Sequence, residues 1–219
     1  MLRNGTGWCE MRLQTTIEIF DYWNRIRGTA DAPLKSQVEP SAVPHLLQSL
    51  FILEMRGGGD IGFRLAGTRI CDLFGRDLRG ERFSSLWAHG QHTDIERTAM
   101  GVMDHAMPAL FNATGYSTVG HQASFEIVMM PLRSPGGACD RLLGAITPAA
   151  AASWLEIVPL EFLALDRSRL LPTHFGPTHF GKSASAQMRP INEIAAGKSA
   201  RFGQAMRRMV SHLLSAEAR

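Results

Sequence analysis

The sequence predicts an α+β fold built on a single antiparallel sheet. Two strand-like runs at 50–66 come first, a helical segment follows, and three more strand-like runs lie between 109 and 147. Short connections between successive strands favour antiparallel pairing of neighbours. We therefore expect a five-stranded antiparallel sheet with short helices on one face, an N-terminal helix and a flexible C-terminal tail.

The N-terminal helix is predicted to run from Leu13 to a break at Gly28. Four apolar residues recur at helical spacing and share one face: Leu13, Ile17, Phe20 and Trp23. This face can pack on the helix's own domain or pair with a second subunit in a homodimer, and the sequence leaves both uses open. Residues 1–12 show no periodicity, and we expect them to form a disordered start.

A β-hairpin and a short helix are expected between residues 50 and 75. The runs from Leu50 to Met55 and from Ile61 to Ala66 are strand-like, and the glycines at 57–59 can turn the chain at positive φ. In the helix that follows, Thr68 is placed to cap the start and Gly75 to end it. The next turn should carry three apolar side chains inward: Phe83, Leu86 and Trp87.

The second half of the domain is predicted to contain one longer helix and three strands. The helical pattern at 90–107 stops before Pro108, which cannot continue it. The strand-like runs are Ala109 to Thr118, Gln122 to Leu132 and Arg141 to Thr147. In the middle run, alternation places Phe125, Ile127 and Met129 on a covered face, and Ser124, Glu126 and Val128 on an open one. Residues 155–171 are expected to form a strand or an extended arm.

Four phrases carry a resemblance to a known family: YWNRIRG at 22–28, FRLAGTRI at 63–70, LFGRDLRG at 73–80 and FSSLW at 83–87. Together with the order of elements, they resemble a bacterial PAS-type family long described as a domain of unknown function. The resemblance covers residues 15–170. It implies a sensory or protein-interaction domain whose ligands are mostly undefined, and it does not imply a reaction.

The apolar side chains expected between sheet and helices are candidates for a ligand pocket: Phe63, Leu65, Ile70, Phe74, Met103, Phe125, Ile127 and Met129. A fully packed core would use the same positions, so a pocket and a filled core are both open. Met and Phe at such positions more often form core than cofactor sites.

The sequence does not favour an enzyme. It lacks a G-x-S-x-G elbow, Cys71 falls on a helical pattern expected to be buried, and Glu54 and Glu126 alternate onto the outer face. The glycines at 57–62 satisfy G-x-G-x-x-G, but a strand follows where the dinucleotide motif needs a helix. The P-loop pattern at 176–183 lies in a duplicated pentapeptide, with too little chain after it for a parallel α/β domain.

No metal or haem site is predicted. His89, His92 and Asp94 could approach one another, but three spaced donors fall short of a closed site, so surface histidines are the simpler interpretation. Some PAS domains bind haem through a histidine in their long helix. Here His105 shares its helical row with Gly101 and Arg97, a solvated row, so haem is not expected and the cofactor, if any, stays unknown.

Charge divides the chain into a domain at 13–170 and a basic tail at 171–219. Residues 1–165 carry 14 basic and 17 acidic side chains, whereas residues 166–219 carry 9 and 3. The tail contains PTHFG twice, at 172–176 and 177–181, and residues 204–218 could form an amphipathic helix. We expect a flexible tail; contact with nucleic acid or membrane is a minor alternative.

The expected compartment is the cytoplasm. The N-terminus lacks a signal-peptide pattern, no run reaches eighteen uncharged apolar residues, and three scattered cysteines suggest no disulfide framework. The expected partners are an unidentified protein and a small-molecule ligand.

Overall fold

The computed structural model describes residues 11–171. Its helices are α1 (Gln14–Arg27), α2 (Thr68–Phe74) and α3 (His92–Asp104), with short 3-10 helices η2 (Lys35–Gln37), η3 (Pro40–Ala42), η4 (Pro44–Ser49), η5 (Phe83–Leu86) and η6 (His89–Gln91). Its strands are β1 (Leu50–Met55), β2 (Ile61–Ala66), β3 (Ala109–Ser117), β4 (Gln122–Arg133), β5 (Cys139–Pro148) and β6 (Leu160–Leu170).

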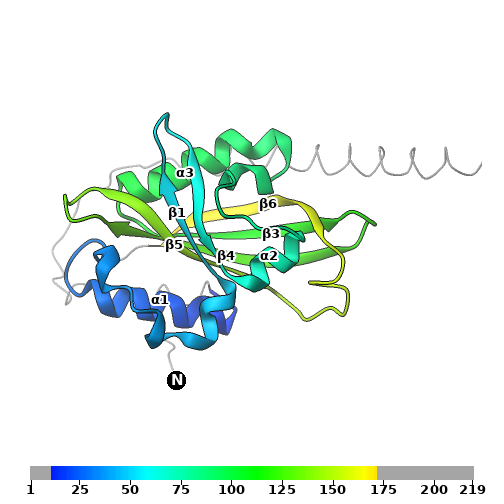
Figure 1. Ribbon diagram of the computed structural model, residues 1–219, viewed down its shortest axis with the longest axis horizontal. Coiled ribbons are helices and arrows are strands. Elements are labelled where there is room, and N and C mark those ends of the chain that lie inside the picture. The colour runs from blue at the N-terminus through cyan, green and yellow to red at the C-terminus, as the bar shows by residue number, and fades with distance from the viewer. Residues whose placement is uncertain (1–10, 172–219) are drawn as a thin grey trace, which may run out of the picture. The chain divides into compact units, whose positions relative to one another are not determined.

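The strands form one antiparallel sheet in the order β2-β1-β5-β4-β3-β6 (Figure 1). The α+β fold with a single antiparallel sheet is confirmed, but the expected number of five strands is wrong. The apolar run at 155–171 contributes β6, which pairs along nearly the whole of β3. Its pairing partner is more than forty residues earlier in the sequence, so local pattern could not assign it to the sheet.

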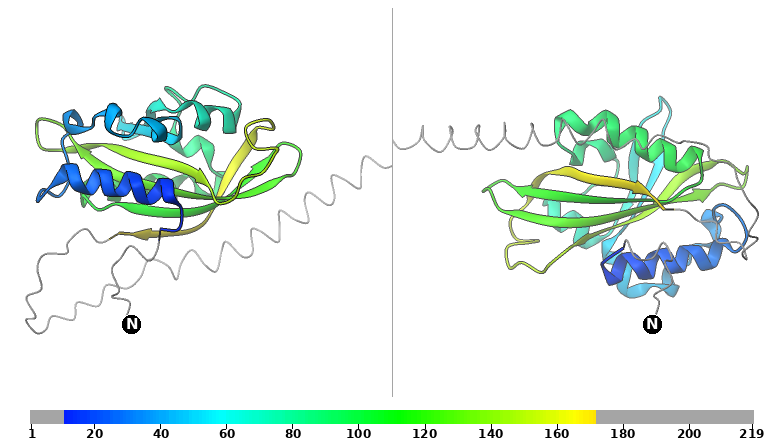
Figure 2. Two further views of the ribbon diagram at one scale, coloured as in Figure 1. Left: turned by 90° about the horizontal axis from the view of Figure 1, so that it is seen from below. Right: turned by 180° about the vertical axis from the view of Figure 1, so that it is seen from behind.

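The inner face of the sheet is covered by α2, η5 and α3. Alternate residues of every strand point to this side, because successive side chains of a strand lie on opposite faces. In α3, Ile95, Ala99, Val102 and Met103 form the buried stripe of an amphipathic helix. Figure 2 shows α3 and α1 on opposite sides of the sheet.

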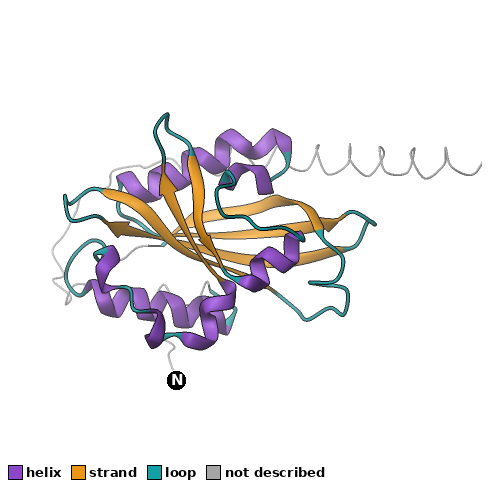
Figure 3. Cartoon of the chain, viewed as in Figure 1, coloured by secondary structure: helices purple, strands orange, loops and turns teal. Residues whose placement is uncertain are grey.

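The outer face is covered as well, which corrects the expectation that one face of the middle strand is open. Helix α1 and the 3-10 helices at 40–49 pack on this side, as Figure 3 shows. Val128 and Met130 are fully buried beneath them, and Glu126 is only 2% exposed. The apolar residues at 128 and 130 were the sign that β4 is buried on both faces.

Several predicted boundaries agree with the structure and one cap does not. Gly75 adopts the left-handed conformation after α2, with φ 63°, and its N–H bonds back to Asp72. Gly58 and Gly59 have positive φ in the β1–β2 turn, so the glycine run is a hairpin turn. Thr68 is the first residue of α2, not its cap; Gly67 holds that position.

Both outer edges of the sheet are blocked. The Gln91 side chain accepts from the Leu165 N–H at 2.7 Å and donates to the Leu165 carbonyl at 3.2 Å, so one amide replaces a strand neighbour for β6. On the other edge, the Phe63 N–H donates to the carbonyl of Glu81 and the Gly80 N–H to the carbonyl of Phe63. Unpaired strand edges invite pairing with other chains, and these contacts remove that opportunity at both places.

The described residues begin inside the segment expected to be disordered. Met11 is 5% exposed and the Arg12 N–H bonds to Glu126, so these two residues are fixed on the sheet. Residues 1–10 and 172–219 lie outside the described part, and so do the predicted basic tail, its PTHFG duplication and its amphipathic segment.

Among residues 11–171, none of the helices has the length and apolar character that crossing a membrane requires.

Replacing Gln91 by alanine should lower the free energy of unfolding by about 1–3 kcal/mol, because the N–H and C=O of Leu165 lose their partner in a partly buried position. Urea denaturation measures the change. Gln48→Ala is the control, since Gln48 is exposed, and its change should stay within about 0.5 kcal/mol. Equal stabilities of the two variants would show that water replaces the Gln91 amide without loss.

Asp166 gives a prediction of pH dependence. Partial desolvation of its carboxyl group raises the pKa of Asp166, although the residue as a whole is exposed, and a 2.9 Å hydrogen bond from the Thr114 hydroxyl acts in the opposite direction. A raised pKa means that the ionised form costs the folded state, so Asp166→Asn should increase stability at pH 7. The gain should shrink towards zero as the pH falls through that pKa and the aspartate takes up its proton. Urea denaturation at pH 7 and pH 3 measures it, and a loss of stability at pH 7 would contradict it.

Candidate functional site

The inner face holds a chain of five aromatic rings in mutual contact. Neighbouring ring centroids are 5.8 to 6.0 Å apart, and each side chain is at most 2% exposed. The rings are Phe51, Phe63, Phe83, Trp87 and Phe111. Aromatic pairs at these separations contribute beyond their buried area. The rings come from β1, β2, β3 and the segment around η5, so they join the hairpin to the rest of the sheet across its inner face.

A glycine makes room for this cluster on the sheet. Gly144 of β5 pairs with Phe51 of β1, and a Cβ atom at Gly144 would overlap the Phe51 ring. The missing side chain lets the ring lie against the backbone of β5.

Seven of the eight candidate pocket residues are buried on this face: Phe63, Ile70, Phe74, Met103, Phe125, Ile127 and Met129. Leu65 is the exception, since its side chain is 48% exposed and the expectation that it points inward is wrong. The β1–β2 register shifts between Ile52 and Leu53, which inserts Arg64 as an extra residue and turns Leu65 to the outer face. Whether the buried seven line a ligand pocket stays a prediction.

The ring cluster includes residues that were expected to point inward but were not assigned to a site. Phe83 and Trp87 were placed inward by the sequence, whereas Phe51 and Phe111 were not singled out. The signal was available in the alternation of their strands, in which Phe51 and Leu53, and Phe111 and Ala113, share the covered face.

Trp87 carries the polar group of this cluster. Its indole Nε1 is buried and has no hydrogen-bond acceptor among residues 11–171. The backbone carbonyl of Trp87 lies 2.8 Å from His92 Nε2, which ties the segment to the start of α3. A buried N–H without an acceptor costs free energy, so this group is where a bound water or ligand oxygen would be stabilised.

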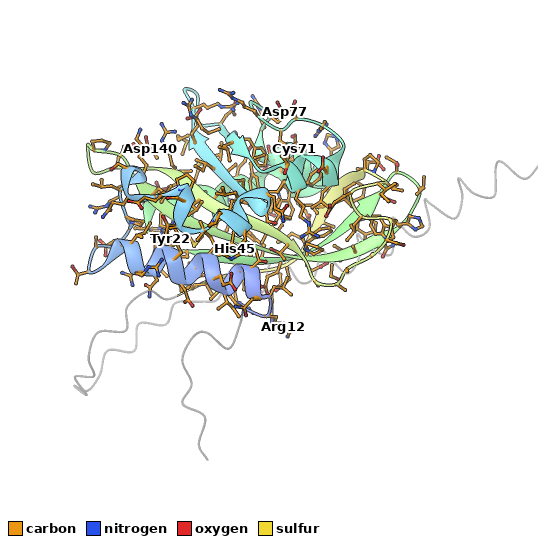
Figure 4. The ribbon with its side chains drawn as sticks, turned by 60° about the horizontal axis from the view of Figure 1, so that its bottom comes forward. Arg12, Tyr22, His45, Cys71, Asp77 and Asp140 are labelled. Atoms are coloured by element: carbon orange, nitrogen blue, oxygen red, sulfur yellow. The ribbon has the colours of Figure 1, made fainter. Side chains whose placement is uncertain are left out.

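The outer face contains a second arrangement, the two-point attachment of α1 to β4. The Glu126 carboxylate accepts hydrogen bonds from the N–H groups of Arg12, at 3.1 and 3.3 Å, and Leu13, at 3.1 Å. Ten residues further along, Trp23 Nε1 donates to the Pro131 carbonyl at 2.8 Å. Figure 4 labels Arg12 beside the start of the helix and Tyr22 further along it.

The distance between the two attachment points is nearly the same along the helix as along the strand. Ten helical residues between Leu13 and Trp23 advance about 15 Å, and five strand residues between Glu126 and Pro131 advance about 16 Å. The helix therefore lies along β4, and a shift by one residue would break at least one attachment.

Two of the predicted dimer contacts are used within the chain. Phe20 is 6% exposed and Trp23 is fully buried, both against the outer face of the sheet. Leu13 and Ile17 are half-buried. The structure thus shows the first of the two uses left open by the sequence, packing on the helix's own domain, and pairing with a second subunit stays a prediction.

A hollow of about 520 Å³ opens on the surface beside α2. It is lined by Cys71, Asp72, Arg76 and, from the loop before β6, Glu156 and Ile157. Arg69 pairs with Glu156 at 2.6 Å, and Ile157 is 77% exposed. Asp77 also lines the hollow, so acidic side chains outnumber the single basic one, Arg76.

The acidic side chains and thiols that were considered for catalysis lie in separate surroundings. Glu54 is half-buried and bonds to Arg141 at 2.8 Å, and Glu126 is engaged with α1. Cys71 and Cys139 are free thiols, and burial raises the pKa of the Cys139 thiol, which lowers its reactivity.

The histidines that were considered as metal or haem ligands have other surroundings. The rings of His89 and His92 lie 4.9 Å apart at the entry to α3, and His105 is exposed just after its end. Within residues 11–171, no group of three His, Cys, Asp or Glu side chains is arranged to hold a metal ion.

Comparison with solved structures finds PAS and light-oxygen-voltage (LOV) domains. The PAS domain of an HTR-like protein from Haloarcula marismortui is 16% identical, with a TM-score of 0.38, over 49% of this chain and 89% of that one. A LOV protein from Rhodobacter sphaeroides is 12% identical, with a TM-score of 0.39, over 48% of this chain and 61% of that one. The light-state Aureochrome1 LOV domain is 15% identical, with a TM-score of 0.39, over 50% and 88%.

No curated protein matches the sequence. The sequence profile of the PAS domain matches residues 11–147, from the start of the described part to the end of β5. Strand β6 lies beyond the match. Because the match covers more than half of the chain and confirms the resemblance of its motifs, the protein belongs to the PAS domain family.

Proposed function

We propose that the protein is a cytoplasmic signalling PAS domain that acts through contact with another protein. The observation that carries this proposal is the filled inner face. Five aromatic rings occupy the space between the sheet and its helices. Each ring contacts at least one neighbouring ring, and all five are shielded from solvent. Binding sites for drug-sized ligands typically measure about 300–1,000 Å³. A ligand of that size would have to displace several of these rings.

Two free cysteine thiols support the proposed cytoplasmic location. Cys71 and Cys139 are both free, and free cysteines are typical of the reducing cytoplasm.

A small-molecule sensor is the second candidate, and one observation favours it. The unpaired Trp87 N–H lies in the ring cluster and could donate to a polar atom of a ligand. Such a ligand would be smaller than the usual cofactors and would carry a hydrogen-bond acceptor. The seven buried pocket candidates would then lie around it.

Native mass spectrometry of the freshly purified full chain separates the two candidates. For the interaction domain we expect the mass of the bare chain, alone or as a defined oligomer, because the inner face is already occupied. A reproducible mass excess that disappears on denaturation would favour the sensor. The Trp87→Phe variant is the matched control, since it keeps an aromatic ring but removes the indole N–H. Loss of the excess in this variant would assign the ligand to Trp87, and persistence would place it elsewhere.

A further inference from the structure

The N-terminal end of α1 is capped by a residue of the sheet. Leu13 occupies the N-cap position but has no polar side chain, and the first turn of α1 contains no acidic residue. The Glu126 carboxylate instead accepts from the N–H groups of Arg12 and Leu13. The N–H of Leu13 at the N-cap position has no partner inside the helix, so a hydrogen bond to it stabilises the start of α1, and the N–H of Arg12 belongs to the residue directly before it. Here the cap comes from a residue 113 positions later in the chain.

Capping and docking of α1 are consequently one interaction. A helix that carries its own cap can leave a sheet with its first turn intact. Helix α1 would lose its cap on leaving, and a negative charge at a helix N-terminus would be lost with it. Glu126 depends on α1 in turn, because a buried carboxylate needs hydrogen-bond donors and Glu126 is only 2% exposed.

The hydroxyl group of Thr147, the neighbour of Glu126 on β5, does not donate to the carboxylate. Thr147 lies directly opposite Glu126 on β5, yet its Oγ1 is buried without a hydrogen-bond partner among residues 11–171. The two backbone N–H groups near α1 are thus the donors that compensate the buried charge.

We infer that Glu126 is a latch that holds α1 on the sheet and that its release opens the N-terminal turns of α1 as one unit. Trp23 and Pro131 form a hinge point further along the same helix, because their hydrogen bond is independent of Glu126. Opening uncovers the apolar outer face around Val128. The use of this opening in signalling rests on the proposed function, whereas the latch itself rests on the contacts above.

Hydrogen–deuterium exchange of the full chain, without any partner, tests the latch. In Glu126→Ala the amides of residues 12–20 should exchange about 10 to 100 times faster, the range expected for losing hydrogen bonds to a charged group. Amides of α3 and β1 should keep their rates. Glu126→Gln keeps the volume and one acceptor oxygen, so it should give a smaller increase in the same residues. It also preserves the test if the alanine variant does not fold.

Glu54→Gln is the matched control. Glu54 is a half-buried glutamate on the same face of the sheet, but it bonds to Arg141, so its variant should leave exchange in α1 unchanged. Unchanged exchange of residues 12–20 in both Glu126 variants would overturn the inference, and so would equal acceleration throughout the domain, because α1 would not open separately. Since no partner is present, either outcome is independent of whether the protein acts by protein contact.

Discussion

Strand β4 is buried on both faces, and much of the remaining structure satisfies that constraint. A strand between two apolar layers cannot leave its polar groups to water, so each must find a partner in the protein. On the outer face Glu126 accepts from the backbone N–H groups of Arg12 and Leu13, directly before α1, and the Pro131 carbonyl accepts from the indole N–H of Trp23. Proline has no N–H of its own, so this residue adds an acceptor to be satisfied but no donor. The position and direction of α1 follow from these two requirements.

The two layers around the sheet have different characters. The inner layer is aromatic and continuous, and its rings connect four separate segments of the chain. The outer layer is aliphatic beneath α1 and is held by directed hydrogen bonds near both ends of the helix. An aromatic interior with a separately attached helix would suit the proposed signalling by contact, because the helix could open without unfolding the core. Within residues 11–171, the indole N–H of Trp87 is the polar group of the aromatic layer that has no hydrogen-bond acceptor.

The sequence predicted what depends on local pattern. The hairpin turn, the stop at Gly75 and the buried faces of α3 and of Phe125, Ile127 and Met129 follow from residue preferences and periodicity. The sequence-based expectations were wrong where contacts between segments far apart in the chain determine the structure. The bulge that turns Leu65 outward depends on the register with β1, and the sixth strand depends on a pairing with β3. Glu126 was assigned to the solvent side because alternation fixes a face but says nothing about what covers it. The carboxylate is recognisable as an acceptor for the start of α1 once α1 is known to begin beside it.

The attachment of β6 has a consequence for how this chain can vary in evolution. Ala88 bonds to Leu163 and Gln91 bonds to Leu165, two residues further along β6. The number of residues between Trp87 and α3 therefore fits the two-residue repeat of the strand. An inserted or deleted residue between Trp87 and Gln91 would displace the amide from Leu165 and break the match. Homologues that keep a sixth strand should therefore conserve the length of this segment more strictly than its composition. Changes in length should accumulate instead in the hairpin turns at 57–60, 118–121 and 134–138, where added residues extend into solvent.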